Sequence, residues 1–166
     1  MLIATAKPAV VEIGPLPAPS FMQAQDAASR TPYDHSNHLL PMCFVCGVDR
    51  EEGDGLRICA GPLASRVEKD TGQPFASHWV PAPNLGDETG EVATEFVWAA
   101  LDCPTGYAAL GSGFADMTGA EAILLGRLAV EVTSRPVHGD RCTVVAQARS
   151  REGRKLSADG ALYGAD

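Results

Sequence analysis

This 166-residue sequence has no long apolar run and fewer basic than acidic residues. No apolar stretch approaches the ~18 to 20 residues that a membrane-spanning helix needs, which argues against a membrane protein. Thirteen Lys and Arg residues stand against 21 Asp and Glu residues, so the formal net charge is −8. Because non-specific binding to nucleic acid depends on clustered basic residues, we expect no nucleic-acid partner.

The N-terminus lacks the pattern of a secretory signal, which is a basic start followed by an unbroken apolar stretch. Lys7 and Pro8 instead interrupt the apolar residues. The five cysteines are an odd number without framework-like spacing, which favours reduced thiols over disulfides. We therefore expect a cytoplasmic protein.

The length fits one compact domain with a single core. Residues 1–40 are rich in proline and show little periodicity, which predicts an irregular N-terminal arm lying on a domain formed by residues 41–166. Strands are expected at 56–60, 75–80, 123–133, 142–148 and 156–163, with a hairpin turn at 151–154. Together with one apolar helix, this order predicts an α+β fold in which an antiparallel sheet wraps around a central helix.

The apolar segment 95–110 is the predicted central helix. Thr94 is its expected N-cap, and Glu95 is favourably placed in the first turn. Pro104 lacks an N–H group and would clash with the carbonyl of Ala100, so we expect the helix to kink or restart near Asp102.

Asp102 is the most informative residue because it is acidic and lies inside this apolar segment. An ionised carboxylate is costly to remove from water unless a charge or a hydrogen bond meets it. Two explanations stay open at this point. Asp102 either caps a restarted helix with Pro104 in its first turn, or it takes part in chemistry.

Two motifs resemble the hotdog-fold acyl-CoA thioesterase superfamily over roughly residues 40 to 163. Ala100-Leu-Asp-Cys-Pro-Thr-Gly-Tyr-Ala108 is similar to the central helix of that family. Pro41-Met-Cys-Phe-Val-Cys-Gly47, followed by Gly53-Asp-Gly-Leu-Arg57, is similar to an entrance segment found in one branch of it.

The resemblance implies a hotdog fold, a homodimer with active sites between the protomers, and hydrolysis of an acyl-CoA thioester without a cofactor. Two departures from the family pattern stand out. Ala93-Thr-Glu95 replaces the usual His-Gly-Gly before the helix, and the family would add one more strand after Gly164-Ala-Asp166.

Thioester hydrolysis needs a carboxylate that activates water or attacks directly, and it needs donors for the developing oxyanion. We predict Asp102 as base or nucleophile, and the backbone N–H groups of Glu95 and Phe96 as donors at the helix N-terminus. The Glu95 side chain is otherwise a solvated first-turn acid. The alternative function is a non-catalytic hotdog module that binds acyl-CoA or another apolar ligand.

Basic residues gather around the predicted 151–154 turn, where they form either a solvated cluster or a clamp for the phosphates of coenzyme A. They are Arg149, Arg151, Arg154 and Lys155. Trp98, one turn before Asp102, is either a core residue or part of an acyl tunnel.

His35-Ser-Asn-His38 and Cys43-Phe-Val-Cys46 carry the residue types that bind zinc. A zinc site here would make the protein a small zinc-stabilised interaction domain, a third hypothesis. The alternative is packed, reduced thiols, which we favour, so we expect no metal. A redox dithiol is favoured less, because the motif does not follow a strand and open a helix.

Overall fold

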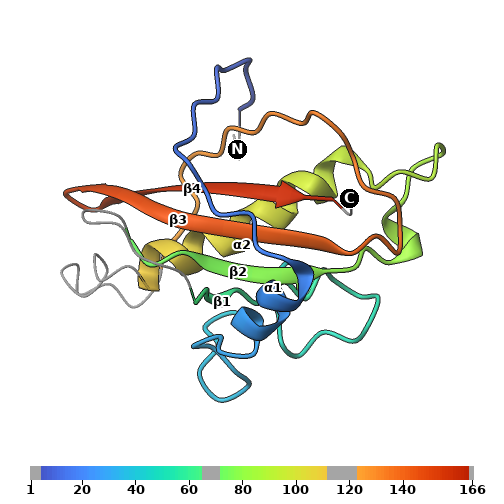
Figure 1. Cartoon of the computed structure of the whole chain (residues 1–166), viewed down its shortest axis with the longest axis horizontal. Helices are drawn as coiled ribbons and strands as arrows, with labels where there is room; N and C mark the ends of the chain where they lie inside the picture. The colour runs from blue at the N-terminus through green and yellow to red at the C-terminus, as the bar shows by residue number, and fades with distance from the viewer. Residues whose placement is uncertain (1–4, 65–71, 112–122, 165–166) are drawn as a thin grey trace.

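The structure is a computed structural model that describes residues 5–64, 72–111 and 123–164 (Figure 1). Its elements in chain order are the helix α1 (Phe21–Ala28), the strands β1 (Gly61–Pro62) and β2 (Phe75–Trp79), the short 3₁₀ helix η1 (Pro83–Leu85), the helix α2 (Thr94–Gly111), and the strands β3 (Cys142–Glu152) and β4 (Lys155–Tyr163). The chain is therefore α+β, as its sequence predicts.

Within the described residues, four strands form one antiparallel sheet in the order β1-β2-β3-β4. β3 and β4 are joined by a tight turn at Gly153, whose φ of 59° suits glycine. The predicted strands at 75–80, 142–148 and 156–163 are confirmed, and the predicted hairpin turn joins the last two of them.

The sheet lies between α1 and α2. Successive side chains of a strand point to opposite faces, so neighbouring residues of a strand contact different helices. Phe75 and Val144 pack in clusters that contain residues of α2. Ala76 and Val145, their neighbours in sequence, pack instead with α1. Figure 1 shows the two helices on different sides of the strands. The predicted N-terminal arm thus lies on the domain through α1.

α2 buries one long side against the sheet and leaves another partly open. Its buried residues are Val97, Ala100, Leu101, Pro104, Tyr107, Ala108 and Ala109. The helix continues through Pro104, whose missing N–H removes one backbone bond without ending it. Of the two expectations for this helix, a kink or a restart near Asp102, the restart is wrong.

Two predicted strands are wrong for one shared reason. Residues 56–60 form no strand, because Leu56 and Ile58 donate backbone hydrogen bonds to the carbonyls of Phe44 and Val45 in the entrance segment instead of joining the sheet. Residues 123–133 form no strand either, and Leu124 is 90% exposed. Alternating apolar residues form a strand only where a neighbouring strand offers hydrogen bonds, and none of the described strands does so here.

No helix of the described part of the chain is long and apolar enough to cross a membrane.

Candidate functional site

Asp102 lies in the middle of α2, so it does not cap a helix. Its own carbonyl accepts a hydrogen bond from Thr105 Oγ1 at 2.7 Å, and its side chain is half-buried. Among the described residues, no hydrogen bond or ion pair reaches its carboxylate. Burial alone raises the pKa of Asp102 above its ordinary value.

The neighbours of Asp102 on the helix surface lie one turn away on either side. Trp98 is 37% exposed, and Thr105 is half-buried. Gly106 follows, and a Cβ placed there would lie 3.3 Å from Ile123 Cδ1. Asp102 therefore borders a partly open face of α2 that carries an exposed aromatic ring. Trp98 is not a core residue.

The N-terminal end of α2 differs from its prediction in two details. The N–H groups of Phe96 and Val97 donate to the carbonyl of Ala93 at 2.9 and 3.4 Å, so the capping position is Ala93 and Thr94 is the first helical residue. The prediction of Thr94 as N-cap is wrong by one position. The Phe96 N–H already has an acceptor, whereas the Glu95 N–H belongs to the first turn, where helices lack internal acceptors. The Glu95 side chain is exposed.

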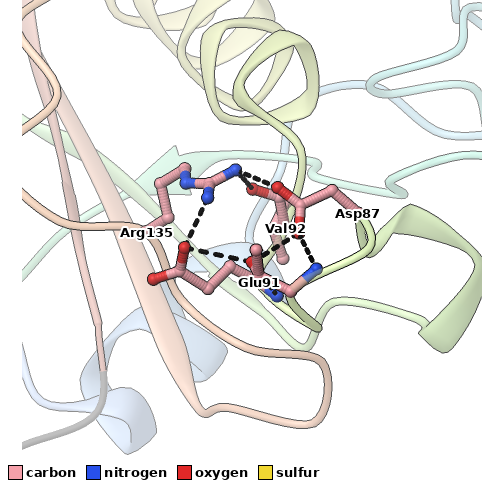
Figure 2. Close-up of polar contacts among 5 residues, drawn as sticks. Asp87, Glu91, Val92 and Arg135 are labelled. Atoms are coloured by element: carbon pink, nitrogen blue, oxygen red, sulfur yellow. Dashed lines mark hydrogen bonds and ion pairs between the residues drawn. The ribbon is translucent and has the colours of Figure 1, made fainter.

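Arg135 fixes the loop that leads into α2 (Figure 2). Its guanidinium pairs with the carboxylates of Asp87 and Glu91 and donates to the Val92 carbonyl at 3.4 Å. Hydrogen bonds from Thr89 and Arg135 lower the pKa of Asp87 to about 2. The sequence analysis missed this network, because its arginine lies more than 40 residues from both acids.

A cluster of three thiols lies where the entrance segment meets α2. Cys43, Cys46 and Cys103 offer sulfur atoms that all lie within 4.8 Å of one another, and Cys43 Sγ is 3.6 Å from Cys103 Sγ. The hydrogen bond with Cys103 lowers the pKa of the Cys46 thiol to about 6. All five cysteines are free thiols.

The two histidines considered with these thiols do not join the cluster. His35 is exposed and contacts Asp49 Oδ1 at 2.7 Å through Nδ1. His38 Nε2 lies 3.1 Å from the hydroxyl of Tyr107, a residue of α2. The third side chain beside Cys43 and Cys46 is therefore Cys103, and not one of the histidines considered as zinc ligands.

The basic residues near the hairpin turn do not act as one group. Arg149 Nε lies 2.6 Å from Asp159 Oδ2, and Arg149 Nη2 donates to the Pro15 carbonyl at 3.0 Å. Arg151 Nε donates to the Gly153 carbonyl at 2.7 Å. Arg154 and Lys155 are exposed. Arg149 therefore anchors the N-terminal arm, and only the residues nearer the turn present charge to solvent.

Two grooves of about 310 and 630 Å³ lie away from Asp102, and Arg57 and His78 line part of both. Neither groove includes Asp102 or Trp98. The described face of α2 around Asp102 therefore lines neither of these two grooves. Comparisons with protein-family models, with curated proteins and with solved structures gave no match.

Proposed function

We propose that this protein is a hotdog-fold acyl-CoA thioesterase in which Asp102 is the base or the nucleophile. The observation that carries the proposal is a half-buried carboxylate that no described side chain neutralises. A buried charge without a partner lowers stability, so a functional role is the simplest reason for its presence. The antiparallel sheet against α2 supports the hotdog arrangement.

The chemistry follows from the raised pKa of Asp102. A carboxylate with a raised pKa is a stronger base than a solvated aspartate, and it removes a proton from water more readily as the water attacks the thioester carbonyl. In the covalent alternative, the carboxylate itself attacks the thioester carbonyl, the C–S bond breaks and coenzyme A leaves as its thiolate, and water then hydrolyses the resulting anhydride. Both routes need donors for the oxyanion.

The two groups of the proposed site lie at different places on α2. Glu95 and Asp102 are seven residues apart, which is about 10 Å of helix. In the hotdog superfamily that the chain resembles, the active site lies between two protomers. We therefore propose a homodimer in which the helix end of one protomer acts with Asp102 of its partner.

The substrate is proposed to lie along the open face of α2. Trp98 offers an apolar ring one turn from Asp102, which suits the acyl chain. Arg154 and Lys155 offer exposed charge for the phosphates of coenzyme A, and Arg151 supports the same turn. Arg149 is left out of this role because Asp159 and Pro15 hold it. Free thiols agree with the proposed cytoplasmic location.

The experiment that tests this function compares wild type with Asp102→Asn on a panel of acyl-CoA thioesters. The amide keeps the shape of the side chain but cannot act as base or nucleophile, so we expect kcat to fall ~100- to 10,000-fold. Circular dichroism controls for folding. Equal turnover by the two proteins would refute the role of Asp102. Binding of acyl-CoA without turnover by wild type would favour the non-catalytic module.

A further inference from the structure

We propose that Cys43, Cys46 and Cys103 bind a zinc ion through three thiolates. This inference does not depend on the proposed thioesterase activity. It revises our expectation of packed thiols without metal, because the sequence motif did not reveal that α2 supplies a third sulfur. The ligands come from two elements, the entrance segment and α2.

The spacing of the sulfur atoms fits tetrahedral zinc. Zn–S bonds are about 2.3 Å, so two sulfurs of a tetrahedral site are about 3.8 Å apart. Cys43 Sγ and Cys103 Sγ are 3.6 Å apart, and all three sulfurs lie within 4.8 Å of one another. Small rotations of the side chains would bring each sulfur to bonding distance from one ion.

The backbone of the entrance segment holds the first two ligands in place. Gly47 donates its N–H to the Cys43 carbonyl at 2.8 Å, which closes a turn that brings Cys43 and Cys46 to one side. A Cβ at position 47 would lie 2.4 Å from the Cys43 carbonyl oxygen, so this turn requires glycine. Leu56 and Ile58 then hold Phe44 and Val45 through backbone hydrogen bonds of 2.8 Å. The loop is therefore ordered by its own contacts.

The donor set selects a soft ion. Thiolates favour zinc over magnesium or calcium, which prefer oxygen ligands. Among the described residues, no other histidine, cysteine or acidic side chain joins the three thiols within 4.8 Å. Cys43 and Cys103 are only partly buried, and a water molecule is the proposed fourth ligand. Three thiolates and one water complete the coordination.

Bound zinc would tie together segments that are 60 residues apart in sequence. Cys103 is the residue after Asp102, so the ion would also fix the middle of α2 against the entrance segment. A ligand that binds the folded chain more tightly than the unfolded chain raises stability by mass action. The melting temperature should therefore rise with zinc and fall with a chelator.

Metal analysis and cobalt spectroscopy of the full chain test this proposal. Wild type, purified under reducing conditions and dialysed against ZnCl₂, should retain about one zinc per chain. CoCl₂ added to the metal-free protein should give thiolate-to-cobalt charge transfer and the visible bands of tetrahedral coordination. Cys103→Ser should lower the zinc affinity by more than about 100-fold, because even groups that only support a ligand are worth ~10- to 100-fold.

Cys59→Ser is the matched control, since Cys59 is also half-buried but lies outside the cluster. It should retain zinc, and so should Asp102→Asn, which separates this site from the proposed catalysis. If wild type retains no zinc and gives no cobalt bands, the proposal fails, whatever the variants do. It also fails if Cys59→Ser loses zinc to the same extent as Cys103→Ser while both remain folded.

Discussion

The carboxylates of Asp87, in the loop before α2, and of Asp102, about two turns into α2, have opposite surroundings. Asp87, in the loop before the helix, pairs with Arg135 and accepts hydrogen bonds from Thr89, which lower its pKa to about 2. Asp102, within the helix, meets no described cation or donor, and burial raises its pKa. One acid has its charge satisfied by the fold, and the other does not.

In our proposal, Asp87 has a structural role and Asp102 has a chemical one. The charge of Asp87 holds the loop before α2 on Arg135 (Figure 2). The charge of Asp102 contributes no described contact, and its desolvation opposes folding at neutral pH. We propose that reactivity is the reason why this half-buried carboxylate is present. The predictions below test the two roles against each other.

The largest expected effect is recovery of activity when two inactive variants are mixed. Glu95→Pro removes a first-turn N–H of α2 that has no acceptor within the helix, and Asp102→Asn removes the proposed base. Each should be inactive alone. After mixing and exchange of subunits, we expect about a quarter of wild-type activity, because half of the random dimers are mixed and each contains one complete site.

The control for this experiment is Glu95→Gln, which keeps the backbone N–H and changes only the exposed side chain. It should remain active, because the proposed donor is the backbone. Size-exclusion chromatography would verify that mixed dimers form. If mixed dimers form and activity stays at the level of the single variants, the helix end and Asp102 do not act across two protomers.

The fold was predictable from sequence where each element carries its own signal. α2, β2, β3 and β4 have apolar patterns, turn residues and lengths that identify them without reference to the rest of the chain. Residues 56–60 and 123–133 have strand-like patterns but no strand partner among the described residues, and partners cannot be read from a local pattern. Local signals therefore identified elements and could not assign their neighbours.

The same limit applies to the residues of the candidate site: those with a local signal were predictable, and those that depend on distant partners were not. Asp102 was identifiable because an acid in an apolar helix stands out by itself. Cys103 and Arg135 were not identified, because their importance depends on Cys43, 60 residues away, and on Asp87, 48 residues away. Arg149 was grouped with the basic turn, although its partner Asp159 lies on the neighbouring strand β4 and its other contact lies in the arm.

A smaller effect is expected on stability, with opposite signs for the two acids. The folded pKa of Asp87 lies below its ordinary value of 3.8, so its charge stabilises the fold above that pH, and this gain is lost as pH falls toward about 2. Asp87→Asn should therefore melt a few degrees below wild type at pH 7, and the difference should close in acid.

Asp102→Asn should behave in the opposite way. A folded pKa raised above 3.8 means that the ionised form costs stability at neutral pH, and that this cost disappears as pH falls through the folded pKa toward 3.8. The variant should melt at or above the wild-type temperature at pH 7. Thermal unfolding followed by circular dichroism across this pH range measures both differences. If both variants melt below wild type at pH 7, or both melt above it, the two acids do not have opposite effects on stability.

The smallest expected effect concerns the basic residues of the turn, where the same contrast separates Arg149 from its neighbours. Arg149 is held by Asp159 and Pro15, whereas Arg154 and Lys155 are exposed. If the exposed pair meets the phosphates of coenzyme A, Arg154→Gln combined with Lys155→Gln should raise KM about two- to thirtyfold at low salt, because two exposed ion pairs at roughly 0.2–1 kcal/mol each contribute about 0.4–2 kcal/mol together. The increase should shrink at high salt while kcat stays unchanged, since only screened ground-state binding is lost.

Lys7→Gln in the arm is the matched control for a lost surface charge, and it should leave KM unaltered. If the double variant leaves KM unchanged at low salt, Arg154 and Lys155 are solvated residues of the turn, and the phosphates of coenzyme A bind elsewhere.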